Sequence, residues 1–154
     1  MAPRTPPWEV RSSAIHGTGV FARRPIRAGR RVIEYTGERI SHEEAARRYD
    51  DTVADFSHVL LFTVDEDIVL DGGVGGSEAR FVNHSCEPSC QALEDGGRIF
   101  IEALRDIAKG EELTYEYDLT LDARHTKSVK ARYACLCRTP ACRGTLLAPK
   151  RRKR

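Results

Sequence analysis

Three cysteines near the C-terminus lie close enough together in the sequence to bind one metal ion. Cys135, Cys137 and Cys142 form the pattern C-x-C-x4-C, which is too tight a cluster for unrelated core cysteines. A structural zinc site takes four ligands in a tetrahedron, so one more must come from elsewhere. The two remaining cysteines are Cys86 and Cys90, and spacing alone does not rank them. Redox-inert or oxidised thiols are the alternative to a metal site.

The segment that holds Cys86 and Cys90 is unusually polar. It reads RFVNHSCEPSC over residues 80–90, with hardly an apolar side chain after Val82. Polar groups packed this densely must be hydrogen-bonded if they are buried. For His84 taken alone, a hydrogen-bonded core histidine and a functional histidine are both compatible with the sequence.

A second group of residues suited to chemistry is the pair of tyrosines in GEELTYEYD, residues 110–118. Tyr115 and Tyr117 are two positions apart, so on a strand both would point to the same face. They could equally be strand-forming residues on an amphipathic strand. In IHGTGVFA, Gly17 and Gly19 could let the backbone approach a ligand, although such a pair more often marks a turn.

Short apolar runs separated by Gly and Asp turns predict the strands that must position these residues. The runs are GVFA at 19–22, RVIEYTG at 31–37, HVLLFTV at 58–64 and DIVLD at 67–71. Residues 91–104 predict a hairpin, because the glycines in Asp95-Gly96-Gly97 supply the positive φ that a tight turn requires. The sequence shows no internal repeat.

Two helices complete the predicted elements. One begins at Ser41, where Ser-x-x-Glu to Glu44 forms a capping box ahead of EEAARRYD. The other covers TKSVKARYA, residues 126–134. Many short strands with few helices predict a β-rich α+β domain.

Length and charge limit the possible classes of protein. The chain has 154 residues, enough for about one domain with its own core. The net charge is +2, and without the five basic residues Lys150–Arg154 it is −3. A slightly acidic body suits a cationic substrate and argues against a basic nucleic-acid groove. The sequence contains neither a signal-peptide apolar region nor a run of about 18 apolar residues, so we expect an intracellular protein without a membrane span.

The motifs GTGVFA, YTGE, RFVNHSC, GEELTYEYD and C-x-C-x4-C occur in an order that resembles the SET-domain protein lysine methyltransferases with a post-SET zinc segment. Each motif alone is weak, whereas all five in this order are highly specific. The likeness runs from Trp8 to about Leu147. It implies a SET domain over residues 8–119, a post-SET zinc segment over 130–147 and a disordered basic tail over 148–154. Because no cysteine-rich segment precedes the domain, the chain resembles a stand-alone SET protein.

The resemblance implies a fold of short strands in small sheets, in which RFVNHSC is threaded by the ELTYEY strand into a pseudoknot. It also implies two bound groups, S-adenosylmethionine and Zn²⁺. Cys86 would be the fourth zinc ligand and Cys90 would be free. The residues implied at the cofactor are Gly17, Thr18, Gly19, Arg80, Phe81, Asn83, His84 and Leu146.

The tyrosines have a chemical role under this resemblance. Tyr117 matches the family's catalytic tyrosine, Tyr35 in YTGE matches the second hydroxyl of the lysine channel, and Tyr115 matches the position that limits how many methyl groups fit. Methyl transfer from a sulfonium needs a neutral, aligned amine. Lysine has a reference pKa of about 10.4, so deprotonation at pH 7 costs roughly 4–5 kcal/mol. A poorly solvated channel lowers that pKa. We expect mono- or dimethyl-lysine as the main product.

The implied partner is a basic protein such as a histone tail, docking by strand addition beside FSHVLLF at 56–62. Two positions depart from the family pattern: Ser89 replaces a common Asn, and Leu60 replaces a common aromatic residue. A catalytically inactive SET module that only binds peptides is the main alternative. A zinc-stabilised nucleic-acid-binding protein using KRRKR and a cysteine hydrolase built on His84 and Cys86 are weaker ones. The basic tail is compatible with a nuclear signal, an automethylation site or a solubilising end, so we expect either the cytoplasm or the nucleus or nucleoid. The sequence does not indicate an oligomeric state.

Overall fold

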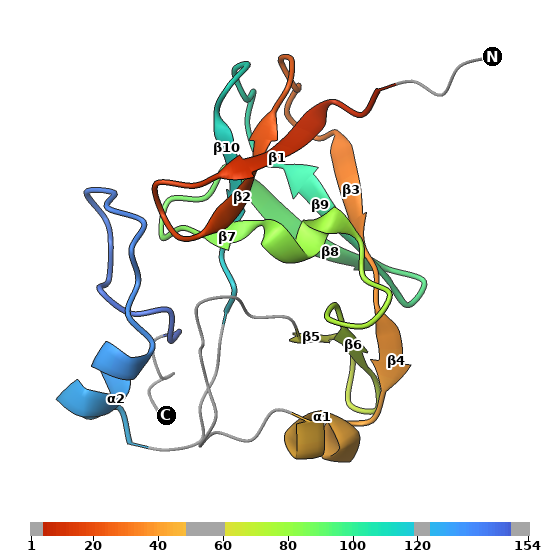
Figure 1. Cartoon of the computed structure of the whole chain (residues 1–154), viewed down its shortest axis with the longest axis vertical. Coiled ribbons are helices and arrows are strands. Elements are labelled where there is room, and N and C mark those ends of the chain that lie inside the picture. Colours follow the sequence, from red (N-terminus) through yellow and green to blue (C-terminus); the bar gives the residue numbers. More distant parts are fainter. Residues whose placement is uncertain (1–4, 49–60, 119–123, 149–154) are drawn as a thin grey trace, which may run out of the picture.

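Short strands in three small sheets make up most of the structure, a computed structural model that describes residues 5–48, 61–118 and 124–148 (Figure 1). The strand orders are β1-β2-β10-β7, β3-β9-β8 and β4-β6-β5. The helical elements of the described chain are α1 (His42–Arg48), the 3-10 helix η2 (Glu78–Phe81) and α2 (Lys127–Arg132). The β-rich α+β class predicted from the sequence is confirmed.

The first sheet brings together segments that are far apart in the chain. It contains β1 (Trp8–Ser12), β2 (Thr18–Ala22), β7 (Asn83–His84) and β10 (Glu112–Tyr115). Strand β10 pairs antiparallel with β2 and parallel with β7, where Thr114 is opposite Asn83 and Tyr115 is opposite His84. The polar segment and the tyrosine motif are therefore neighbours, as the pseudoknot expectation requires. The ladder ends at Tyr115, so Tyr117 lies beyond the strand that was expected to carry both tyrosines.

The second sheet is built on the predicted hairpin. Strands β8 (Cys90–Asp95) and β9 (Arg98–Ala103) are joined by Gly96 and Gly97, both with positive φ (61° and 82°). Strand β3 (Arg31–Tyr35) pairs with the other edge of β9 and places Tyr35 opposite Ile99. The hairpin prediction is confirmed, because only glycine adopts this conformation readily at both positions.

The third sheet contains β4 (Glu38–Ile40), β5 (Leu61–Thr63) and β6 (Val69–Asp71), and α1 follows β4. The predicted cap of α1 is present, since Ser41 Oγ accepts from the Glu44 N–H at 3.0 Å. The Glu44 carboxylate pairs with Arg47 and Arg48 instead of completing a capping box. The predicted strand over 58–64 is described only from Leu61 onward, and residues 49–50 of the predicted helix lie outside the described chain.

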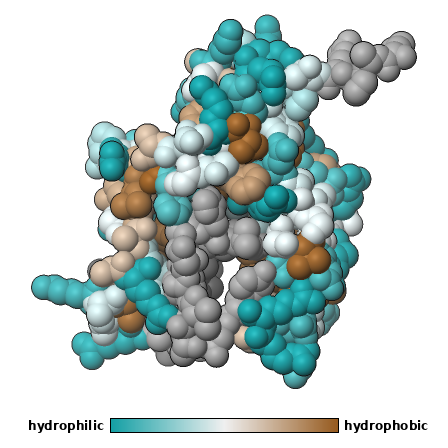
Figure 2. Space-filling model, in the orientation of Figure 1, coloured by the Kyte–Doolittle hydropathy of each residue, from teal (hydrophilic) through white to brown (hydrophobic). Residues whose placement is uncertain are grey.

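Apolar side chains from all three sheets form the main core. Its largest fully buried members include Tyr35, Ile99, Ile101, Leu113 and Val20. On the face in Figure 2, hydrophilic residues predominate and apolar residues form small separate patches. This distribution agrees with strands that turn their apolar side chains inward.

A second, smaller cluster holds the C-terminal segment together. It contains Tyr133, Cys135, Cys137, Leu146 and Leu147. The helix α2, predicted from the sequence, begins after Thr126, whose side chain accepts from the Val129 N–H at 3.2 Å. The predicted tail lies outside the described residues from position 149 onward. No helix among the described residues is both long enough and apolar enough to span a membrane.

Candidate functional site

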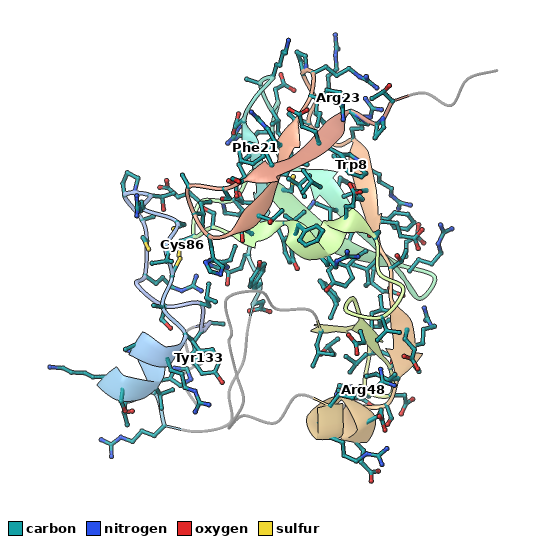
Figure 3. All side chains as sticks on the ribbon, in the orientation of Figure 1. Trp8, Phe21, Arg23, Arg48, Cys86 and Tyr133 are labelled. Carbon is teal, nitrogen blue, oxygen red and sulfur yellow. The ribbon has the colours of Figure 1, made fainter. Side chains whose placement is uncertain are left out.

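Four cysteines converge at the C-terminal segment. The Sγ atoms of Cys86, Cys135, Cys137 and Cys142 all lie within 4.8 Å of one another. The Cys86 and Cys135 sulfurs are 3.8 Å apart. A tetrahedral zinc ion with Zn–S bonds of about 2.3 Å requires sulfurs about 3.8 Å apart. The four side chains therefore fit one zinc ion, and Figure 3 shows where Cys86 lies beside the C-terminal segment.

The surroundings of these sulfurs also suit thiolate ligands. The backbone N–H groups of Arg143 and Gly144 point at the sulfurs of Cys86 and Cys142, each at 3.4 Å. Such N–H contacts stabilise negative charge on sulfur. Cys90 lies apart from the cluster, fully buried in the main core. Burial raises the pKa of its thiol to about 11. The structure thus groups Cys86, and not Cys90, with the three C-terminal cysteines.

The imidazole of His84 lies between the cysteine cluster and Tyr117. Its Nδ1 accepts the Tyr117 backbone N–H at 3.1 Å, so Nε2 carries the proton of the neutral ring. Nε2 lies 3.5 Å from Cys86 Sγ and 3.7 Å from a Glu116 carboxylate oxygen. Burial lowers the pKa of His84, against the opposing charge of Glu116. Both ring nitrogens are therefore engaged inside the protein.

Three tyrosines and one phenylalanine form an aromatic group beside this histidine. The ring centroids are 4.9 Å apart for Tyr115 and Tyr117, 6.3 Å for Phe62 and Tyr115, and 5.3 Å for Tyr35 and Phe62. The Tyr117 hydroxyl donates to the Val82 carbonyl at 2.7 Å. Among the described residues, nothing hydrogen-bonds the Tyr115 hydroxyl.

Burial makes the tyrosine hydroxyls poor acids. It raises the pKa of Tyr117 above the ordinary value, with the charges of Tyr35 and Glu112 acting in the same direction. It also raises the pKa of Tyr115. The two hydroxyls therefore stay neutral throughout the physiological range. The structure brings the three predicted catalytic tyrosines together, although Tyr35 comes from a different sheet.

The loop before β2 is tied to Asn83. The Asn83 side-chain amide donates to the carbonyls of His16 and Thr18, both at 3.2 Å. Gly17 has φ 45°, which suits a turn. A Cβ on Gly19 would lie 2.9 Å from Ser13 Cβ and 3.0 Å from Glu112 Oε2, so close packing already requires this glycine.

The remaining predicted cofactor residues have clear structural roles of their own. The Arg80 guanidinium donates to the Gly76 carbonyl at 2.7 Å and lies 4.5 Å from the Phe81 ring centroid. Leu146 is buried in the second apolar cluster, against which Tyr117 also packs. Leu146 and Tyr117 thus both pack in the second apolar cluster. The Arg80 side chain points instead toward the loop that contains Gly76.

Sequence reasoning did not identify two charged residues of this region. Arg143 forms two 3.0 Å hydrogen bonds with the Glu116 carboxylate, clamping the C-terminal segment onto the tyrosine motif. Glu112 accepts hydrogen bonds from Ser13 and Asn83. Nothing in the spacing of these residues signals either contact, because the partners are 27 to 99 positions apart.

Comparison with known proteins defines the class. The family model described as SET domain matches residues 17–118. This match covers well over half of the chain, and the chain belongs to the SET-domain family. It confirms the family that the motif order had indicated.

The relatives of the chain are histone-lysine methyltransferases. It is 45% identical over 150 residues to the "Histone-lysine N-methyltransferase, H3 lysine-4 specific" of Eremothecium gossypii, covering 93% of this chain and 15% of that protein. It is 40% identical over 148 residues to the protein of that name in Candida albicans, covering 93% of this chain and 14% of that protein. It is 41% identical over 142 residues to "Histone-lysine N-methyltransferase ATX2" of Arabidopsis thaliana, covering 87% and 12%. The chain thus spans less than a sixth of the length of these relatives.

One solved structure has a similar fold. It is described as ctPRC2 in an autoinhibited conformation bound to S-adenosylmethionine. The match has a TM-score of 0.66 at 33% identity and covers 74% of this chain and 15% of that one.

Proposed function

We propose that this protein transfers methyl groups from S-adenosylmethionine to the ε-amine of a lysine in a histone tail. The single observation that carries the proposal is the group formed by buried Tyr35 and Tyr115 and partly buried Tyr117 next to the Asn83-His84 strand. Relatives named as specific for H3 lysine 4 make that lysine the first substrate to test.

The tyrosines would hold the substrate amine. A lysine side chain entering an aromatic channel loses hydration, which lowers its pKa and favours the neutral, nucleophilic amine. The neutral hydroxyl oxygens of Tyr117 and Tyr35 would accept hydrogen bonds from the amine N–H groups, which leaves the nitrogen lone pair free and adds no fixed charge that favours ammonium. Bound S-adenosylmethionine would supply the electrophilic methyl group. The chain's contribution is then orientation of the amine and exclusion of water.

Asn83 and the loop of Gly17, Thr18 and Gly19 would bind the cofactor. Because the His84 ring nitrogens are engaged with Tyr117 and Cys86, we assign any direct cofactor contact of His84 to its backbone or ring carbons. Arg80 and Phe81 would act by stabilising the loop that precedes β7. Leu146 would cover the site from the C-terminal segment.

The four-cysteine cluster would hold a structural zinc ion. With all four positions taken by sulfur, such an ion has no open site for substrate, so its contribution is folding energy. It would stabilise the C-terminal segment against Tyr117. The proposed limits are a SET domain at 8–119, a post-SET segment at 130–147 and a basic tail at 148–154, with action in the nucleus on chromatin.

The test measures methyl transfer and cofactor binding with the same variant. We expect Tyr117→Phe to reduce methylation of a histone H3 peptide by orders of magnitude while S-adenosylmethionine still binds in calorimetry. An H3 peptide with lysine 4 replaced by alanine is the control for the target lysine. Wild-type protein that binds the cofactor but methylates neither histones nor other basic proteins would instead indicate an inactive peptide-binding module.

A further inference from the structure

Two turns lie side by side at the end of the molecule that is uppermost in Figure 1. The first turn, residues 23–30, joins β2 to β3, and the second turn, residues 104–111, joins β9 to β10. Ile26 and Ile107 form an antiparallel bridge with reciprocal backbone hydrogen bonds of 2.9 and 2.8 Å. Both isoleucines are 1% exposed and belong to the main core, so each turn has a fixed position.

The two turns match each other position by position. The Gly29 N–H donates to the Ala103 carbonyl at 2.8 Å, and the Gly110 N–H donates to the Ala22 carbonyl at 2.7 Å. Both glycines have positive φ, 84° and 85°. Residues 22–29 and 103–110 share only Ala, Arg, Ile and Gly at corresponding positions, which is why the sequence showed no repeat. Each side chain of the first turn therefore has a structural counterpart in the second.

The counterparts differ in charge. In the second turn, the Glu111 carboxylate pairs with the guanidinium of Arg105. In the first turn, Arg24 corresponds to Arg105, and Arg30 corresponds to Glu111. A second cation thus occupies the position from which an acid neutralises the arginine of the second turn. The first turn contains no acidic residue at all.

The cations of the first turn are Arg23, Arg24, Arg27 and Arg30. None of them pairs with a carboxylate of the described residues. Arg23, labelled in Figure 3, and Arg24 donate to the backbone carbonyls of Trp8 and Thr5, at 3.4 and 2.9 Å. Arg27, Arg30 and the neighbouring Lys109 of the second turn are exposed. The Asp106 carboxylate beside them accepts the Ala28 N–H at 2.9 Å. The surface is therefore cationic, although the chain without its basic tail is slightly acidic.

This surface has the chemistry of a phosphate-binding site on a nucleic acid duplex. Arginine binds phosphate oxygens through two parallel N–H donors, and an arginine without an acidic partner keeps its charge available for such contacts. Proteins that bind single strands stack the bases on aromatic side chains. Neither turn contains an aromatic residue. Phosphate contacts of this kind position a protein on DNA without reading its sequence.

We propose that the first turn, together with Lys109, docks on the phosphate backbone of double-stranded DNA. The turns precede β3 and β10, whereas Tyr35 and Tyr115 are the last residues of these strands. The length of β10 alone is roughly 10 Å at 3.3 Å per residue. Bound DNA would therefore leave the tyrosines free for a lysine substrate. This inference goes beyond the proposed function, because it adds a second partner that binds away from the methyl-transfer site.

The variant Arg30→Glu tests the proposal by giving the first turn the acid that the second turn has at Glu111. It removes one cation and provides a carboxylate that can pair with Arg24, so two phosphate contacts are lost. Binding to a short fluorescein-labelled DNA duplex is measured by fluorescence anisotropy over a range of salt concentrations. We expect the slope of log affinity against log salt to decrease in magnitude by about 2. At about 0.1 M salt the affinity should fall roughly 10- to 100-fold.

The control is Lys127→Glu, which makes the same change of charge at an exposed position of α2. Its DNA affinity should stay within about threefold of the wild type, because salt screens charges that lie away from the contact. Failure of the wild type to bind DNA, an unchanged affinity of Arg30→Glu, or an equal loss with Lys127→Glu would overturn the proposal. Equally tight binding of polyglutamate by the wild type would assign the surface to an acidic protein and would also overturn it.

Methylation of a free histone H3 peptide separates this inference from the proposed function. Arg30→Glu should methylate the peptide at the wild-type rate, because the turn lies away from the tyrosines; a parallel loss of peptide methylation would overturn the assignment of a separate DNA site. A wild type that binds DNA through the first turn but methylates no peptide would refute the proposed function and leave the DNA site standing.

Discussion

Two substitutions of His84 should separate its contact with the metal cluster from its contact with Tyr117. Asparagine can place its Oδ1 near the position of Nδ1, keeping an acceptor for the Tyr117 N–H but losing the donor toward Cys86 Sγ. Glutamine can place its Nε2 near the histidine Nε2, keeping that donor but losing the acceptor. The two native contacts are 3.1 Å and 3.5 Å long.

The expected magnitudes follow from the two contacts. Loss of a hydrogen bond to a metal-bound ligand typically lowers metal affinity about 10- to 100-fold, which we expect for His84→Asn. An unpaired, partly buried backbone N–H costs about 1–3 kcal/mol. In His84→Gln the Tyr117 side chain would be displaced, and we expect the free energy of the transition state to rise by the same amount. The rate of methyl transfer should then fall about 5- to 150-fold.

The assays are zinc competition against a chromophoric chelator and single-turnover methyl transfer with saturating cofactor. His84→Asn should change mainly the zinc affinity, and His84→Gln should change mainly the rate of methyl transfer. His42→Asn is the control, because His42 lies on α1 and its ring contacts the Asp65 carbonyl. If both variants lose zinc affinity and methyl transfer in parallel, His84 is only a general packing residue and the reasoning is refuted.

Three further outcomes are expected. Cys86→Ser should remove stoichiometric zinc, whereas Cys90→Ser should retain about one equivalent by metal analysis; zinc loss with Cys90→Ser alone would reverse the choice of ligand. The wild type should form mainly mono- or dimethyl-lysine, and Tyr115→Phe should accumulate higher methylation states in mass spectrometry, because its hydroxyl has no partner to lose among the described residues; an unchanged product ladder would contradict this. The raised pKa of Tyr117 keeps its hydroxyl protonated beyond pH 10 in the folded protein. Methyl transfer should therefore rise with pH as the substrate amine deprotonates, with no fall from tyrosine ionisation below pH about 10. The unfolded chain's tyrosine ionises near that pH, so stability should decline only above it; a descending limb near pH 8 that Tyr117→Phe abolishes would oppose the assignment.

Local chemistry made several parts of this structure predictable. The Gly96-Gly97 turn, the cap at Ser41 and the helix after Thr126 depend on neighbouring residues, and each is present. The C-x-C-x4-C spacing likewise keeps three sulfurs within eight residues of one another in the chain. The order of the five motifs predicted the SET-domain family, because the motifs are spread along nearly the whole chain.

Contacts between residues distant in the sequence decided the remaining features of the site. Whether Cys86 or Cys90 joins the cysteine cluster depends on how the C-terminal segment packs against β7, and the two residues are only four positions apart. Tyr35 meets Phe62 and Tyr115 through contacts between different sheets. The ladder ends before Tyr117, because the Tyr117 N–H bonds to the His84 ring rather than to a strand. The partners of Glu112 and Arg143 are likewise distant in sequence, and hydrogen-bonded pairs of this kind leave no periodic signal. The sequence alone therefore determined which chemical groups are present and their local conformation, whereas packing between distant segments decided which of them meet.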